Sequence, residues 1–239
     1  MTALLLAALL AGDVVVFAAA SLKEAFTELG ALFEAEHPGA RVVLNLAGSQ
    51  ELRTQLDHGA AADLFAPADE RQVAALQGLL LAPQIFARNE PVLIVPRDAA
   101  PEGGGIRSLD DLPRARRIVL GDRAVPIGAY SEQILARRGA AFQRSVEARL
   151  VSRELNVRQV LTKVALGEAD AAIVYRTDAL AAGAAVRAIA IARADNVLAA
   201  YPIAQLRKAP QPALAAALLL FITSPRGRAV LARRGFLPP

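Results

Sequence analysis

Residues 14–26 read V-V-V-F-A-A-A-S-L-K-E-A-F, a short apolar run that leads directly into a helix-period segment. The run from Val14 to Phe17 is apolar throughout, which is typical of a strand covered on both faces. Apolar residues then recur at helical spacing from Leu22 to Phe33, and the pattern stops at Pro38-Gly39. A buried strand followed at once by an amphipathic helix predicts an α/β fold.

The same alternation of strand and helix continues along the chain. Strand-length apolar runs occur at 41–46, 63–66, 92–95, 117–120 and 171–175, and helical spacing fits 70–80, 131–138, 158–166 and 212–221. Strands that are apolar throughout need cover on both faces, so we expect mostly parallel sheets flanked by helices.

Two stretches are candidate crossings between lobes. At 87–96 a polar turn leads into a strand, and 199–206 reads A-A-Y-P-I-A-Q-L. If the chain crosses at both, residues 13–88 and 204–239 form lobe 1 and residues 89–203 form lobe 2. The cleft between such lobes can close on a ligand by hinge motion.

Residues 1–12, M-T-A-L-L-L-A-A-L-L-A-G, are predicted to be part of an export signal. The apolar stretch is shorter than the about 20 residues that span a membrane. A buried N-terminal segment is the alternative.

Composition narrows the function classes. The chain has no cysteine, so it has neither a disulfide framework nor a cysteine nucleophile, and only two histidines, His37 and His58, for which we expect surface positions. The formal net charge is +4, but the arginines are scattered, which argues against nucleic acid as a partner. The nucleophile-elbow, phosphate-loop, dinucleotide and zinc-protease motifs are absent from the sequence, so we do not expect an enzyme.

Four junctions that precede helices share small or polar residues and carry no charge at the junction itself. Such a junction exposes backbone N–H groups at the positive end of a helix dipole, which is the physical basis of an anion site. Ordinary helix caps would give the same pattern. The junctions are Ala20-Ser21, where S-L-K-E matches a capping box to Glu24, Ala47–Gln50, Val125–Gly128 with Pro126 opening the helix, and Leu155–Val157 with Asn156 as cap and Gly167 ending the helix.

From Val14 on, the sequence resembles the periplasmic molybdate-binding proteins of ABC importers. The resemblance lies in the order and spacing of F-A-A-A-S-L-K-E-A-F, L-A-G-S-Q-E-L, A-A-D-L-F-A-P-A-D, V-P-I-G-A-Y, N-V-R-Q-V-L, A-A-I-V-Y-R-T-D-A and S-P-R-G-R-A-V-L-A-R-R-G-F. It implies a two-lobed type II periplasmic-binding-protein fold and a monomer that binds molybdate or tungstate without a cofactor. It also implies a periplasmic or extracytoplasmic location, and the membrane permease and ATPase of an ABC importer as partners.

The resemblance further implies which residues hold the anion. Ser21 and Ser49 would bind it through hydroxyl and backbone N–H, Ile127 and Val157 through backbone N–H, and Tyr175 through its phenol. Molybdenum would be bound only as the molybdate oxyanion, through these residues. The sequence departs from the family at Ile127, where alanine is expected; for Tyr175 the alternative is a strand-end aromatic in the core.

None of the five positions is Asp or Glu, which suits a fully deprotonated dianion that only accepts hydrogen bonds. Two alternatives stay open. One is a binding protein for sulfate or another tetrahedral oxyanion. The other is the ligand-sensing domain of a regulator, a class that carries a helix-turn-helix for which the residues before Asp13 leave no room.

Overall fold

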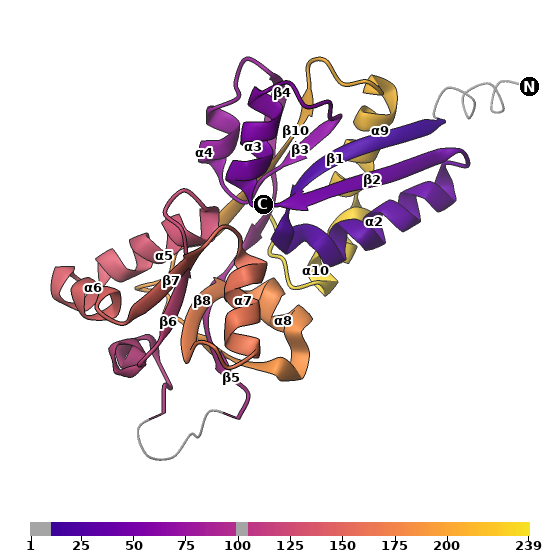
Figure 1. Ribbon diagram of the computed structural model, residues 1–239. Coiled ribbons are helices and arrows are strands. Elements are labelled where there is room, and N and C mark those ends of the chain that lie inside the picture. Colours follow the sequence, from indigo (N-terminus) through magenta and orange to yellow (C-terminus); the bar gives the residue numbers. More distant parts are fainter. Residues whose placement is uncertain (1–10, 99–104) are drawn as a thin grey trace, which may run out of the picture. The chain divides into compact units, whose positions relative to one another are not determined.

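The computed structural model describes residues 11–98 and 105–239, which form two compact units (Figure 1). Of the described residues, unit 1 takes 11–88 and 200–239, and unit 2 takes 89–98 and 105–199. The sequence placed the changes of lobe after residues 88 and 203, whereas the compact units change after residues 88 and 199. Most of the expected export segment lies outside the described residues, and Gly12 already belongs to the first strand.

Unit 1 is built on a five-stranded sheet in the order β2-β1-β3-β10-β4. β1 pairs in parallel with β2 and β3, and β10 runs antiparallel to β3. Its strands are β1 (Gly12–Ala19), β2 (Ala40–Ala47), β3 (Leu64–Ala66), β4 (Leu80–Asn89) and β10 (Ala199–Leu206); its helices are η1 (Ala20–Leu22), α2 (Lys23–Glu36), α3 (Ser49–Asp57), α4 (Glu70–Ala74), α9 (Pro212–Thr223) and α10 (Pro225–Arg233).

Helices cover the unit 1 sheet as the apolar strands require. Phe17 and Phe65 pack in one buried cluster with Leu52 and Leu56 of α3. α2, α9 and α10 pack on one another, with the rings of Phe33 and Phe221 in edge contact at 5.8 Å between centroids. Val14 and Val16 of β1 are fully buried, so the strand is covered as predicted.

Unit 2 is built on a second five-stranded sheet, in the order β7-β6-β8-β5-β9. β6 pairs in parallel with β7 and β8, and β5 runs antiparallel to β8 and β9. Its strands are β5 (Pro91–Pro96), β6 (Ile118–Gly121), β7 (Leu150–Glu154), β8 (Ala171–Tyr175) and β9 (Val186–Ala190); its helices are η2 (Leu109–Arg114), α5 (Pro126–Arg137), α6 (Ala140–Glu147), α7 (Val157–Ala165), α8 (Arg176–Ala182) and η3 (Gly183–Ala185).

The α/β class and all six predicted strands are confirmed, and two details differ. Both sheets are mixed, because β5 and β10 run antiparallel to the parallel strands beside them. The helix predicted over 70–80 ends at Ala74, residues 75–79 form turns, and Leu80 begins β4. Gly78 in this stretch is a poor helix former, and Leu80 belongs to the sheet and not to the helix.

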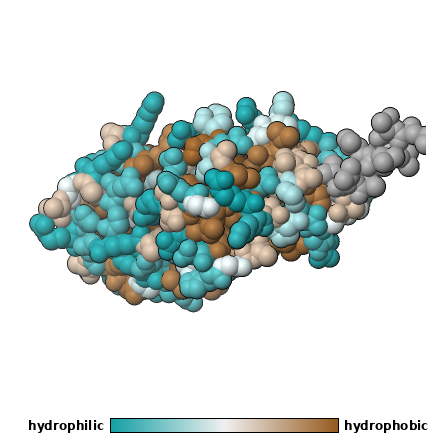
Figure 2. Space-filling model, turned by 90° about the horizontal axis from the view of Figure 1, so that it is seen from above, coloured by the Kyte–Doolittle hydropathy of each residue, from teal (hydrophilic) through white to brown (hydrophobic). Residues whose placement is uncertain are grey.

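The visible face in Figure 2 is largely hydrophilic with smaller hydrophobic areas between. Among the described helices none alone has the length and hydropathy of a membrane span; α9 and α10 reach it only when taken together, across a 62° bend.

Candidate functional site

In unit 1 the two predicted serines follow neighbouring strand ends. Ala19, the last residue of β1, lies opposite Ala47, the last residue of β2, in a parallel register. Ser21 and Ser49 each come two residues later. The carboxyl ends of parallel strands meet at one edge of a sheet, which is where α/β proteins bind ligands. The fold therefore brings these two serines to the same edge.

Ser21 lies inside η1 and is not the helix cap that the sequence predicted. The N-cap of η1 is Ala19 and that of α2 is Leu22, and neither caps through its side chain. The capping box to Glu24 is therefore wrong, because a 3-10 turn separates the serine from the α-helix. The hydroxyl of Ser21 lies instead 2.8 Å from the hydroxyl of Tyr201, and both are buried.

Ser49 is the first residue of α3, after Gly48 as N-cap. The Gly48 N–H donates to Glu51 Oε2 at 2.8 Å, which closes the helix start from outside. The Ser49 hydroxyl accepts a hydrogen bond of 3.1 Å from the N–H of Ala68, just beyond β3. Only 2% of Ser49 is exposed. Its side chain thus links the ends of β2 and β3.

In unit 2, Ile127 stands in the first turn of α5, which opens on Pro126 as predicted. The backbone of this turn runs against the end of β6: a Cβ on Gly128 would lie 1.9 Å from the Asp122 carbonyl oxygen. The Ile127 side chain packs on the same place, since a Cβ on Gly121 would lie 2.8 Å from Ile127 Cγ2. Gly121 thus leaves room for the isoleucine where the family was expected to have alanine.

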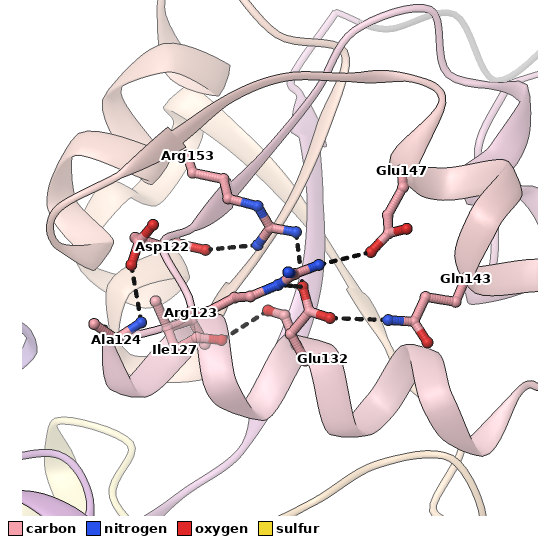
Figure 3. A network of polar contacts seen from close by, with 10 residues as sticks. Asp122, Arg123, Ala124, Ile127, Glu132, Gln143, Glu147 and Arg153 are labelled. Carbon is pink, nitrogen blue, oxygen red and sulfur yellow. Dashed lines mark hydrogen bonds and ion pairs between the residues drawn. The ribbon is translucent and has the colours of Figure 1, made fainter. Parts of the chain in front are cut away.

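A network of charged residues lies beside this turn, between α5, α6 and β7 (Figure 3). Arg153 of β7 donates to Glu132 of α5 at 2.7 Å and to the Gly121 carbonyl oxygen at 3.3 Å. Arg123 pairs with Glu132 at 3.4 Å and with Glu147 of α6 at 3.0 Å. These contacts fix α5 to β6 and β7, and so fix the backbone at Ile127.

Val157 is the first residue of α7, and Asn156 is the N-cap, as predicted. The Asn156 side chain accepts from the N–H groups of Arg158 and Gln159 at 3.0 and 3.1 Å. The Asn156 side chain thus accepts from the second and third N–H groups of the helix, and it does not bind the first, which is that of Val157. Arg158 Nε lies 2.9 Å from Oδ1 of Asp178, which is fully buried in the first turn of α8.

Tyr175 is the last residue of β8 and only 1% exposed. Its ring meets that of Tyr130 of α5 edge to face, with 6.4 Å between centroids. In unit 2 the three predicted positions thus lie at or beyond the ends of three adjacent strands: Ile127 after β6, Val157 after β7 and Tyr175 on β8. Each unit gathers its predicted residues at one edge of its sheet.

Sequence reasoning missed Tyr201, Gly121 and the Arg158–Asp178 pair. Tyr201 falls in the A-A-Y-P stretch that indicated only a crossing between lobes, and Arg158 and Asp178 lie in two of the matching stretches without an assigned role. The histidines form no site: His37 is half-buried and stacks on Phe33 at 4.1 Å, and His58 is exposed. The described residues contain no cluster of three or more His, Asp or Glu suited to a metal ion.

Each of the two mixed sheets thus carries its predicted donor residues at or beyond the carboxyl ends of neighbouring strands, the place where α/β proteins bind ligands. The chain belongs to the family of bacterial extracellular solute-binding proteins, whose model matches residues 14–237. It is 41% identical over 233 residues to the molybdate-binding protein ModA of Mycobacterium tuberculosis (strain ATCC 25618 / H37Rv). The matched region covers 96% of this chain and 86% of that protein.

Solved structures share the fold. The periplasmic molybdate-binding protein of Azotobacter vinelandii matches with a TM-score of 0.80 at 19% identity, over 95% of this chain and 99% of that one. The sulfate-binding protein SubI of Mycobacterium tuberculosis H37Rv matches with a TM-score of 0.83 at 19% identity, over 95% and 86%. At these identities the likeness concerns the fold alone.

Proposed function

We propose that this protein captures molybdate, and also tungstate, outside the cytoplasm and delivers the oxyanion to the permease and ATPase of an ABC importer. The observation that carries the proposal is the 41% identity to a molybdate-binding protein over 96% of the chain. Export is part of the proposal, as is a monomeric state.

The proposed ligand residues are Ser21 and Ser49 of unit 1 and Ile127, Val157 and Tyr175 of unit 2. Each presents a neutral donor, a hydroxyl or a backbone N–H, and each is at least 96% buried. A buried dianion held by several oriented dipoles does not need a charged partner, which would bring its own desolvation cost. The donor set therefore suits an anion that offers only acceptors.

Sulfate has the same charge and shape class as molybdate, so a donor-only set does not separate them. The fold does not separate them either, because the sulfate-binding and molybdate-binding structures both match it. The chain-long sequence identity favours molybdate. The two anions differ in size, and a direct titration is the decisive comparison.

The test is calorimetric titration of the purified protein with molybdate, tungstate, sulfate and phosphate, supported by thermal unfolding in each anion. A ligand that binds only the folded state adds about 2.7 kcal/mol to the free energy of unfolding at 100 times its Kd, and so raises the unfolding temperature. We expect molybdate and tungstate to bind at micromolar or lower concentration and phosphate not to bind. Tight sulfate binding without molybdate binding would replace the ligand, and no response to any oxyanion would remove the proposal.

A further inference from the structure

Tyr201 of unit 1 contacts one of the five proposed ligand residues but is not one of them itself. It is the third residue of β10, is fully buried, and its hydroxyl lies 2.8 Å from that of Ser21. The ring is held edge to face against Phe236, with 5.4 Å between centroids. A buried phenol normally bonds a polar partner, and here that partner includes a residue proposed to bind the anion.

The distance alone fits either hydroxyl as the donor of this hydrogen bond, and the difference in acidity favours the phenol. A phenol, with a pKa near 10, is far more acidic than an alkyl hydroxyl and is the better donor. With Tyr201 donating, the Ser21 oxygen accepts, and the single hydroxyl hydrogen of Ser21 is left to point elsewhere. Tyr201 thus sets which way the serine can donate.

The second serine is arranged in the same way. The Ser49 oxygen accepts from the Ala68 N–H, a group that can only donate, so the hydroxyl hydrogen of Ser49 is also left for another acceptor. Two serines at one sheet edge each receive a hydrogen bond from within unit 1. This arrangement directs both hydroxyls as donors, which is what an acceptor-only anion requires.

We propose that Tyr201 is a positioning residue: its phenol donates to Ser21 and so directs the Ser21 hydroxyl to the bound oxyanion. The inference rests on the proposed function. Tyr201 acts through Ser21, not by its own contact with the anion. Loss of the phenol oxygen leaves the Ser21 hydroxyl able to rotate, so part of the Ser21 contribution to binding is lost.

A pair of double-mutant cycles tests this, with molybdate affinity as the readout. Ser21→Ala is expected to weaken binding about tenfold and Tyr201→Phe about fivefold, in the range of single hydrogen bonds. Adding Tyr201→Phe to Ser21→Ala should cost less than twofold more, because the serine through which it acts is gone. Ser49→Ala is the matched control: Tyr201→Phe should cost the same fivefold in that background as in the wild type.

The outcomes separate this inference from the proposed function. If the wild type binds no oxyanion, the proposed function fails first. If the wild type binds but Tyr201→Phe binds equally well, Tyr201 does not position Ser21. An equal loss in the wild type and in Ser21→Ala would mean that Tyr201 acts without Ser21, which overturns the inference. Unfolding temperatures measured without ligand show whether each variant is folded. We expect Tyr201→Phe to fold, because it keeps the ring that packs against Phe236.

Discussion

Gly128 is the residue on which the start of α5 depends most directly. The backbone of α5 approaches the end of β6 so closely that a methyl group on Gly128 would lie 1.9 Å from the Asp122 carbonyl oxygen and 2.5 Å from that of Gly121. Neither backbone atom can move without moving the strand end. The N–H of Ile127, proposed to bind the anion, is held by this contact.

We therefore expect Gly128→Ala to lower stability by about 1 to 3 kcal/mol, the usual cost of overpacking, and to weaken molybdate binding at least tenfold. Chemical unfolding and calorimetric titration measure the two effects. Gly78→Ala is the control, because a Cβ there meets nothing within 4 Å. Normal binding by Gly128→Ala would show that the close approach does not position Ile127.

How far single residues could be predicted depends on the range of their contacts. Asn156 and Pro126 were recognised as helix openers because a cap acts within three residues of itself. Ser21 was proposed as a site residue from the family resemblance, but its partner Tyr201 stands 180 positions away in the chain. A contact of that range is set by strand order, which local sequence pattern does not report.

At the scale of elements, α2 is tied to α10 by one carboxylate and two guanidinium groups. Glu28 of α2 accepts from Arg233 at 2.6 Å and from Arg234 at 2.8 Å. The hydrogen bond from Arg233, followed by that from Arg234, holds the pKa of Glu28 below its ordinary value of 4.5. A carboxylate with a lowered pKa stabilises the fold above its ordinary pKa, and this contribution is lost as the pH falls through the lowered value.

Comparison of Glu28→Gln with the wild type should follow this sign. We expect the variant to be less stable at pH 7, by no more than about 1 kcal/mol because the pair is partly exposed. The difference should shrink as the pH falls below about 4.5 and vanish once Glu28 is protonated in the folded protein. Thermal unfolding of both proteins between pH 7 and pH 3 measures it. A difference that stays constant over this range would contradict the assigned pKa shift.

Strand prediction followed apolar composition more closely than burial, since the half-buried edge strand β2 was predicted and the buried strand β10 was not assigned as a strand. The six predicted strands are apolar runs, and all of them form. β7 reads L-V-S-R-E and alternates only weakly, so it was not recognised as a strand. Its polar residues make contacts at the sheet edge: Arg153 donates to Glu132, and Glu154 pairs with Lys163. β4 and β9, which lie at the sheet edges, were missed as well.

At the scale of the whole molecule, the proposed donors are divided between two units that the chain links at residues 88/89 and 199/200. Ser21 and Ser49 belong to unit 1, and Ile127, Val157 and Tyr175 belong to unit 2. If one anion binds both sets of donors, its binding must reduce local opening of the backbone in both units. A ligand held by one unit alone would leave the other unchanged.

Hydrogen exchange read by mass spectrometry distinguishes these cases, since local opening is measured peptide by peptide. We expect molybdate to slow exchange at the starts of α2 and α3 in unit 1 and at the starts of α5 and α7 in unit 2. Peptides from α6, which carries none of the proposed donors, serve as the internal control and should change little. Protection confined to unit 1 would remove the proposed roles of Ile127, Val157 and Tyr175, and protection confined to unit 2 would remove those of Ser21 and Ser49.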